Sequence, residues 1–490
     1  FQLNSYFLKK HLNWMKSNIA KIVIQLPIIV IPIILLMINN NITNIISILL
    51  LAFLILYNLP KKKAKIAFNL TSRVIRMFIT EAILILIIML INKDIILIKL
   101  SILNILAPIM VIIANCINFP IEKLIRNKYI NQAKKILADM PNLIVIGVTG
   151  SYGKTSVKNF LERTLSSKYE VLSTPKNYNT TMGVVKTIRE NLKPIHQIFI
   201  CEMGATNVGD IKEICDIVKP KFGVITAIGP QHLQSFKTID NIIKTKFELA
   251  DSVRKNGGVT FLNYNNEYIM NKEKEGNIIT YGVNNPDLDY NSYNLRSSSQ
   301  GLSFTMFDKK NNEEIEFKTN LIGKHNIINL TAAIAVANYL GITLKSLIPH
   351  IRKIESVRHR LQLISRDNFN IIDDSYNSNP VSSKSAIDTL AEFEGTKIIV
   401  TPGLIELGED EEKYNFELGQ YMTKYCDYIF LVNSKSTKFV LDGIIDKNFN
   451  KDKVFSVNIP GEAIQQISRL NTGKKITVLL ENDLPDNYNI

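Results

Sequence analysis

A phosphate-binding loop constrains the fold of this chain more than any other stretch of its sequence. An apolar run ends at Val148, the pattern Thr-Gly-x-x-Gly-Lys-Thr follows at 149–155, and a helical pattern starts at Val157. Glycines let backbone N–H groups surround a phosphate, and the N-terminus of a helix adds positive dipole. The lysine adds a full charge, and the threonine hydroxyl can hold Mg²⁺. The order of strand, loop and helix therefore predicts a nucleotide-binding α/β domain.

The loop is shorter than the standard P-loop, because the position six residues before Lys154 is Val148 instead of glycine. A chance match in an ordinary loop is the alternative, and the flanking strand and helix argue against it. We expect ATP to be held by the residues of this loop, namely Gly150, Ser151, Tyr152, Gly153, Lys154, Thr155 and Ser156.

The positive charge of the chain is concentrated in its N-terminal part. The 490 residues carry a formal net charge of +14, and residues 1–140 hold 17 Lys and Arg against 4 Asp and Glu. The remaining residues are close to neutral, with 41 basic and 40 acidic side chains. Because the basic part is also the apolar part, a membrane explains the charge better than nucleic acid does. No basic stripe with interleaved aromatic residues follows, so nucleic-acid binding is disfavoured.

Four apolar runs predict transmembrane helices within residues 1–118. They span residues 22–38, 42–59, 77–91 and 95–117, and runs near 18 residues with few charges match the thickness of a bilayer. A core of buried helices is the alternative, which the brief polar breaks between the runs disfavour.

Basic residues gather before the first run, between the second and third runs, and after the fourth. This distribution predicts that the catalytic part faces the cytoplasm from the plasma membrane. The polar, basic segment at 119–142 is expected to form a connector helix.

Strand-like and helical patterns alternate across residues 143–345. Apolar runs at 143–148, 198–203, 222–228 and 258–262 are separated by helical patterns. Such alternation is typical of a parallel sheet covered by helices, with functional groups at the carboxyl ends of its strands.

Three polar residues near these strand ends are candidates for a metal site. Glu202 ends one strand, where a carboxylate could hold Mg²⁺ or be an ordinary solvated strand end. His232 follows the next strand, although a lone histidine is more often structural. Lys246 belongs to a charged run on the following helix, where a solvated face is the ordinary interpretation.

Together with the phosphate loop, these residues resemble the Mur ligase family, the ATP-dependent amide-bond formers of cell-wall synthesis. The segment Thr-Pro-Lys-Asn-Tyr-Asn-Thr-Thr at 174–181 is similar to the family's Thr-Pro-Gly-Asn-x-Asn element. His232 and Lys246 keep the spacing of its histidine and carbamylated lysine. The stretch 323–329 is similar to the family's Gly-x-His-Asn-x-x-Asn element, and by this resemblance Asn326 approaches adenine.

Residues 346–490 are predicted to form a Rossmann-like C-terminal domain. Its sequence Asp-Asp-Ser-Tyr-Asn-Ser-Asn-Pro at 373–380 resembles the MurF-type members of the family, which add D-alanyl-D-alanine to UDP-linked muramoyl tripeptide. The resemblance implies that Arg360 and Asp374 reach the nucleotide from this domain. A surface ion pair for Arg360 and a helix cap for Asp374 are the alternatives.

The resemblance also implies an acyl-phosphate mechanism at the boundary of two domains, where hinge closure is expected. Lys154 would hold the β- and γ-phosphates, while Thr155 and Glu202 would hold one Mg²⁺. His232 and carbamylated Lys246 would hold a second Mg²⁺. The residues expected on the substrate side are Asn179, Thr180, Thr181, Tyr376 and Asn377.

Two departures from the family pattern leave the substrate open. The strand at 477–483 reads Thr-Val-Leu-Leu-Glu-Asn-Asp where relatives carry Lys-Gly-Ser, and apolar runs occupy the place of the domain that grips UDP. The acceptor could therefore be a lipid-linked wall precursor or a polyglutamate-type polymer. A membrane transport or signalling ATPase is a further alternative, which the sequence at 373–380 disfavours.

Overall fold

The chain forms two compact units, Phe1–Lys128 with Pro485–Ile490, and Tyr129–Leu484. The structure is a computed structural model. The residues that it describes are 11–12, 15–16, 30–31, 34–35, 38, 40–58, 69–90, 96–175, 178–272, 275–366, 369–376, 378–433, 437–470 and 472–482.

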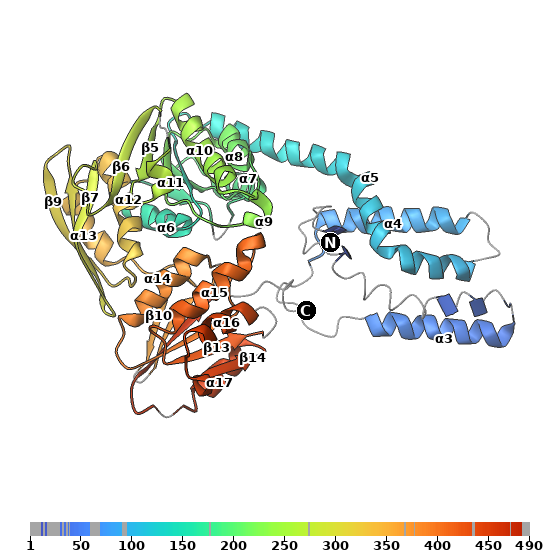
Figure 1. The fold of residues 1–490 in the computed structure, drawn as a ribbon. Helices are drawn as coiled ribbons and strands as arrows, with labels where there is room; N and C mark the ends of the chain where they lie inside the picture. The colour runs from blue at the N-terminus through green and yellow to red at the C-terminus, as the bar shows by residue number, and fades with distance from the viewer. Residues whose placement is uncertain are drawn as a thin grey trace. The chain divides into compact units, whose positions relative to one another are not determined.

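Long helices form the described part of the first unit (Figure 1). They are α3 (Asn41–Asn58), α4 (Ser72–Leu90) and α5 (Ile96–Ala138), and α5 continues past Lys128 into the second unit. Because α5 continues through Pro108 and Pro120, the fourth apolar run and the expected connector are one helix. Most of the first apolar run, residues 22–38, lies outside the described residues.

One stretch of α5, Leu106–Ala138, is long and apolar enough to cross a membrane by length and composition. One such helix within the described residues is weak support for membrane insertion, because core helices of soluble proteins share these properties. The four predicted spans therefore stay a prediction.

Polar contacts join the start of α4 to the middle of α5. Arg76 Nε donates to Glu122 Oε1 at 2.7 Å, and Arg73 Nη2 donates to Asn115 Oδ1 at 3.3 Å. One turn further, Asn118 Nδ2 donates to Thr80 Oγ1 at 2.9 Å. Arg73 and Arg76 thus lie in the first turns of α4, and Glu81 is the one further charged residue of this otherwise mostly apolar helix.

A nine-stranded sheet forms the first part of the second unit, in the order β2-β3-β1-β4-β5-β6-β7-β8-β9. β1 (Ile144–Thr149) pairs in parallel with both β3 and β4. Its residues alternate between two cores, since Val145 packs in one cluster and Ile146 in the other, so the strand is buried on both faces. The other strands are β2 (Val171–Ser173), β3 (Ile198–Glu202), β4 (Phe222–Ile225), β5 (Val259–Asn263), β6 (Asn277–Val283), β7 (Tyr290–Ser298), β8 (Gly301–Asp308) and β9 (Glu313–Thr319).

The sheet is mixed: the strands predicted between residues 143 and 262 pair in parallel as expected, and antiparallel strands extend the sheet beyond them. Pairing is parallel from β2 through β7, whereas β7, β8 and β9 pair antiparallel. The short turns that join these last strands can connect only antiparallel neighbours. The helices on this sheet are α6 (Lys154–Leu165), α7 (Thr181–Asn191), α8 (Asp210–Val218), α9 (Leu233–Phe236), α10 (Ile239–Lys255), α11 (Glu267–Met270), α12 (His325–Tyr339) and α13 (Leu344–Arg352).

A six-stranded sheet forms the second part of this unit, in the order β10-β11-β15-β12-β13-β14. It is parallel except for the edge strand β10, so this part is a mostly parallel α/β domain as predicted. Its strands are β10 (Gln362–Arg366), β11 (Phe369–Asp374), β12 (Thr396–Thr401), β13 (Tyr428–Val432), β14 (Val454–Val457) and β15 (Ile476–Glu481). Its helices are α14 (Pro380–Ala391), η2 (Gly408–Asp410), α15 (Glu411–Met422), α16 (Lys438–Asp446), η3 (Lys451–Lys453) and α17 (Pro460–Ile467).

The antiparallel strands share the core of the parallel ones, which predicts the effect of a substitution there. Phe317 of β9 is fully buried and stacks on Phe304 with ring centroids 5.7 Å apart. Phe317→Ala should lower the free energy of unfolding by about 3–5 kcal/mol, because it leaves a cavity in the main cluster. Urea unfolding measures the loss, and Glu316→Ala on the solvent side of β9 should stay within about 0.5 kcal/mol. Equal effects of the two substitutions would contradict the shared core.

Candidate active site

The phosphate loop between β1 and α6 is braced by the residues that follow β4. Ser151 N–H donates to Ala227 O at 2.6 Å, and Thr226 Oγ1 donates to Tyr152 O at 2.5 Å. A Cβ on Gly150 would lie 2.1 Å from Thr226 Oγ1, so only glycine fits there. Gly153 has a φ of 82°, in the left-handed region that favours glycine. The loop is therefore held in shape by its own domain.

Lys154 lies inside this loop, between an acidic and a basic side chain. Its Nζ donates to Gly150 O at 2.7 Å and to Ser151 O at 2.8 Å. Burial lowers the pKa of Lys154 to about 8, the charge of Glu202 opposes that shift, and the charge of Arg360 adds to it. Arg360 belongs to the C-terminal domain, so side chains of both domains act on this ammonium.

Glu202 connects the phosphate loop to the loop that precedes α7. This carboxylate ends β3 and is 1% exposed. Its Oε1 accepts from Thr155 Oγ1 and from Asn179 Nδ2, each at 3.1 Å. The structure thus brings together three residues that the sequence placed on metal and substrate, namely Thr155, Asn179 and Glu202.

Lys158 is a member of this cluster that the sequence analysis missed. It lies one turn after Lys154 on α6, is 2% exposed, and its Nζ is 3.3 Å from Glu202 Oε2. The same ammonium donates to Thr174 O at 2.9 Å, and Thr174 Oγ1 accepts from the Glu202 N–H at 3.0 Å. The sequence pattern could have predicted that Lys158 is buried, because it lies among the buried residues Val157, Phe160 and Leu161 of an amphipathic helix.

His232 and Lys246 are placed by the segment after β4 and by α10. His232 Nδ1 lies 2.6 Å from Glu406 Oε2 of the C-terminal domain. Lys246 is 3% exposed, and its Nζ is 6.0 Å from the centre of the Phe236 ring. Within the described chain it makes no hydrogen bond or ion pair. Burial drives the pKa of Lys246 well below its usual value, and the charge of Lys154 adds to the shift.

Arg360 and Asp374 come from the C-terminal domain. The Arg360 guanidinium stacks over the Tyr376 ring at 4.5 Å, and burial lowers its pKa. Asp374 Oδ1 accepts from the Leu361 N–H at 3.1 Å. Burial raises the pKa of Asp374 to about 7, against the opposing charge of Arg360 and with the added repulsion of Glu481. Glu481 is the register partner of Asp374 on β15, so their carboxylates occupy the same sheet edge.

Other predicted site residues have local partners. Asn326 Nδ2 donates to Ile322 O at 2.9 Å, and it is Asn329 whose side chain lies beside the phosphate loop, 2.8 Å from a Cβ built on Gly153. Thr180 caps α7 by accepting from the Gly183 N–H. Thr181 Oγ1 donates to Glu213 Oε2 at 2.6 Å. Ser156 is partly buried in the first turn of α6, and Asn377 lies outside the described residues.

The predicted metal ligands do not form a ready-made cluster of acidic, histidine or cysteine side chains. In the described ranges, no group of three or more such residues is arranged to hold a metal ion. The predicted set holds one carboxylate, one histidine, one hydroxyl and one lysine, namely Glu202, His232, Thr155 and Lys246. Mg²⁺ commonly keeps water and substrate phosphate as ligands, so few protein groups suffice. The metal assignment therefore stays a prediction.

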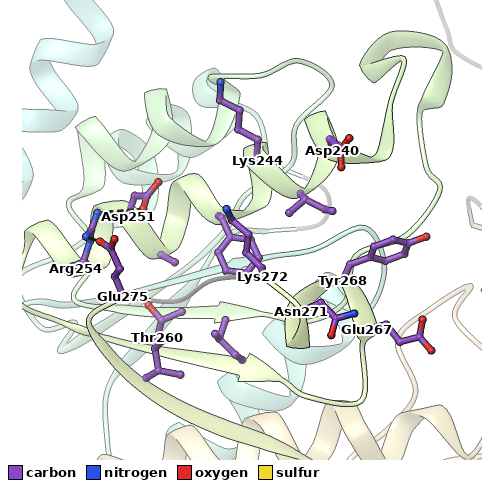
Figure 2. Close-up of a pocket in the computed structure, with 15 residues that line it drawn as sticks. Asp240, Lys244, Asp251, Arg254, Thr260, Glu267, Tyr268, Asn271, Lys272 and Glu275 are labelled. Atoms are coloured by element: carbon purple, nitrogen blue, oxygen red, sulfur yellow. Dashed lines mark ion pairs between the residues drawn. The ribbon is translucent and has the colours of Figure 1, made fainter.

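A separate hollow of about 720 Å³ lies beside α10 and α11 (Figure 2). Lys244 lines this hollow, whereas Lys246 is buried, because residues two apart on a helix point to different faces. Arg254 forms ion pairs with Asp251 and Glu275 there. The charged run on α10 is thus divided between a surface hollow and the domain interior.

The fold and site together define an ATP-dependent ligase class, in which a phosphate loop faces a strand-end carboxylate and a second α/β domain supplies an arginine. Residues 148–337 match the model of the Mur ligase middle domain, and residues 359–480 match that of the Mur ligase glutamate ligase domain. The chain belongs to the Mur ligase family, and it is an ATP-dependent amide-bond ligase with MurF-like domains.

Two curated relatives share this assignment across most of their length. The UDP-N-acetylmuramoyl-tripeptide--D-alanyl-D-alanine ligase of Bacillus subtilis is 30% identical over 341 residues, covering 69% of this chain and 72% of the relative. The ligase of the same name from Haemophilus influenzae is 29% identical over 357 residues, covering 71% and 76%.

Solved structures match the same part of the chain. MurF from Acinetobacter baumannii superposes with a TM-score of 0.66 and 25% identity, covering 74% of this chain and 78% of that one. MurF from Thermotoga maritima, solved in complex with ADP, also gives a TM-score of 0.66, at 23% identity and with 74% and 81% coverage. The latter likeness supports the fold alone.

The buried pair of Lys158 and Glu202 leads to a stability prediction. Lys158→Met should lower the free energy of unfolding by about 3–5 kcal/mol, because it strands a buried carboxylate. The double variant Lys158→Met/Glu202→Gln should recover most of the loss, as measured by urea unfolding. Lys186→Met is the matched control, since Lys186 pairs with Glu190 at the surface and such pairs contribute about 0–1 kcal/mol. A double variant as unstable as Lys158→Met would contradict the pairing.

The raised pKa of Asp374 predicts how its contribution depends on pH. Between its usual value of 3.8 and about 7, the unfolded chain loses this proton while the folded chain keeps it. Folding stability from this group must therefore fall as pH rises through that window. Asp374→Asn should melt progressively higher than the wild type as pH increases from 4 to 8, on the order of several degrees at the upper end.

Asp442→Asn on the exposed face of α16 supplies the control. The melting temperature of this variant should differ from that of the wild type by the same amount at every pH. A constant offset for Asp374→Asn would show that this carboxyl does not titrate in the window.

Proposed function

We propose that this ligase joins D-alanyl-D-alanine to a UDP-linked muramoyl tripeptide. The relatives at about 30% identity carry that activity in their names, and the sequence at 373–380 resembles the same branch of the family. The observation that carries the proposal is the convergence of Thr155 and Asn179 on one oxygen of Glu202. It joins the nucleotide loop to the segment expected on the peptide side.

The proposed reaction proceeds in two displacements. A carboxylate oxygen of the peptide attacks the γ-phosphorus of ATP, the bond to the β-phosphate oxygen breaks, and ADP leaves. The amine nitrogen of the dipeptide then attacks the acyl carbon, phosphate leaves, and the nitrogen loses a proton. In this scheme Lys154 and the amides of its loop bind the phosphates, and Arg360 adds positive charge from the other domain.

The residues present fit two divalent cations. Thr155 and Glu202 offer hard oxygen ligands for one. Glu202 Oε2 makes no hydrogen bond to the described residues, although Lys158 Nζ lies 3.3 Å from it. His232 and Lys246 would hold the other, and bound Mg²⁺ would supply charge neutralisation to phosphoryl transfer. Lys246 suits carbamylation, because an amine must be neutral to add CO₂ and burial lowers the pKa of this lysine.

We also propose that the first unit anchors the enzyme at the cytoplasmic face of the plasma membrane. Beyond its first turns, α4 exposes large apolar side chains, including Phe78, Ile79, Ile83, Leu86 and Leu90. Its arginines lie at the other end and contact Glu122. A helix pair with exposed apolar sides and a charged end suits insertion from one side of a bilayer.

A second acceptor is favoured by one observation. The family models start at residue 148, so the apolar first unit lies outside the matched part of the chain. A membrane-embedded unit would suit a lipid-linked wall precursor better than a freely diffusing nucleotide. A polyglutamate-type polymer is a weaker candidate, since it rests only on the departure at 477–483.

The deciding experiment supplies the detergent-solubilised chain with ATP, D-alanyl-D-alanine and one acceptor at a time. Mass spectrometry should find the pentapeptide product with UDP-muramoyl tripeptide, and phosphate release should require both acceptor and amine. Product only with the lipid-linked acceptor would favour the second candidate. Phosphate release without either substrate would indicate an ATPase of another kind.

The role of Lys246 leads to a separate prediction. Lys246→Ala should abolish ligation, with a loss of at least about a thousandfold, because it removes a ligand that positions the transferred group. Nuclear magnetic resonance of the wild type in ¹³C-bicarbonate should show a carbamate carbon, which the variant should lack. Lys244→Ala, on the outer face of the same helix, should retain both activity and signal. Full activity of Lys246→Ala would remove this residue from the site.

A further inference from the structure

The loop between β12 and η2 brings a carboxylate of the C-terminal domain to His232. Glu406 Oε2 lies 2.6 Å from His232 Nδ1. Both residues have left-handed backbones, with φ of 63° at Glu406 and 52° at His232. This conformation is uncommon for residues other than glycine, and it persists only where the surrounding structure holds it.

Glu406 is held by the core of the C-terminal domain. Leu404 and Leu407 flank it in sequence, are 1% and 2% exposed, and belong to the same hydrophobic cluster. Asn415 on α15 fixes the loop by accepting from the Leu404 N–H at 2.8 Å and donating to Leu404 O at 2.9 Å. The backbone that carries Glu406 is therefore anchored to the C-terminal domain.

His232 is held equally firmly by the middle domain. Gly229, three residues earlier, exchanges hydrogen bonds with Ser151 Oγ of the phosphate loop at 3.0 and 3.1 Å. The His232 carbonyl accepts from the Phe236 N–H at 3.0 Å, and Phe236 is buried. The short contact between Glu406 and His232 thus joins anchored segments of the middle and C-terminal domains.

The carboxylate selects one tautomer of the histidine. An ionised carboxylate can only accept, so Nδ1 carries the hydrogen, and in the neutral imidazole Nε2 is then the nitrogen with the lone pair. Nε2 makes no hydrogen bond to the residues that the structure describes. A histidine whose Nδ1–H is bound by a carboxylate is the usual arrangement behind a metal ligand.

The exposure of the pair argues that its role is orientation. The His232 and Glu406 side chains are 28% and 42% exposed. A pair with this much solvent contact contributes only about 0–1 kcal/mol to stability even when both groups are charged, which does not account for two left-handed backbones. The strain is more simply explained by the need to aim the imidazole.

We propose that Glu406 is a positioning residue that orients His232 Nε2 toward a divalent cation when the two domains close. Cation binding and closure of the C-terminal domain are then coupled, because the ligand reaches its orientation only with the other domain in place. This inference rests on the proposed function, which assigns His232 to a metal. It adds a residue from the opposite domain that touches neither metal nor substrate.

The test measures Mn²⁺ binding to the full chain in the presence of ADP, by electron paramagnetic resonance of the free ion. Glu406→Ala should weaken binding of the Mn²⁺ ion that His232 ligates by about 10- to 100-fold. Glu406→Gln keeps an acceptor oxygen and should lose less. Glu409→Ala, an equal change of charge at an exposed position of η2, should bind as the wild type does.

His232→Ala separates this inference from the proposed function. If His232→Ala leaves Mn²⁺ affinity unchanged, the metal assignment itself fails. If it weakens binding while Glu406→Ala does not, only the positioning role is overturned. The double variant should bind no more weakly than His232→Ala, because Glu406 acts through the histidine.

Hydrogen exchange provides a readout that does not depend on affinity. In the wild type, Mn²⁺ with ADP should slow exchange in residues 402–408, although this loop belongs to the other domain. Glu406→Ala should abolish that slowing while both domains keep their own protection. Equal slowing in the wild type and in Glu406→Ala would overturn the coupling of cation binding to closure.

Discussion

The burial of the Glu202 charge is the constraint around which the site is built. A carboxylate with 1% exposure at a strand end needs compensation, and it receives it from Lys158, Thr155 and Asn179. Each of these comes from an element that the parallel sheet places at the same edge. The phosphate loop and the peptide-side loop are therefore joined through one side chain. The proposed chemistry therefore depends on the Glu202 carboxylate, whose burial the surrounding side chains must compensate.

The parts of the fold that local patterns encode were predictable from the sequence. Hydrophobic periodicity, together with the glycine and proline residues that end elements, is enough to predict the strand before the phosphate loop and the helix after it. The same signals predict the mostly parallel C-terminal domain. The antiparallel strands β8 and β9 were not resolved, because short polar turns say little about which existing sheet a hairpin extends. The continuity of α5 was also not predicted, because the change from an apolar run to a polar, basic segment near residue 118 suggested two separate segments.

The site was predictable to the extent that each residue followed a strand. Glu202 ends β3 as that rule predicts, whereas Lys246 lies in the middle of α10 and was singled out only by the family resemblance. The functional roles of both residues stay predictions. The burial of Lys158 was not predicted, because a lysine on a helix is ordinarily exposed to solvent. Only its position among buried neighbours on α6 indicates that it faces the interior. Glu406 could not be paired with His232 from sequence, because 174 residues separate them and only tertiary structure brings them together.

The continuity of α5 sets a rule for how the chain can vary in length. Its final turns are fixed against the catalytic unit, since Ala133 is fully buried and the Arg189 guanidinium stacks on Tyr129 at 4.0 Å. Each residue inserted upstream in an unbroken helix rotates everything before it by about 100° and shifts it by about 1.5 Å. An insertion or deletion near residue 125 therefore changes the face of α5 on which each upstream side chain lies, whereas the contacts of Tyr129 and Ala133 are unaffected. In a continuous helix, the number of residues sets the angular position of every side chain, so the length of α5 matters as well as its composition.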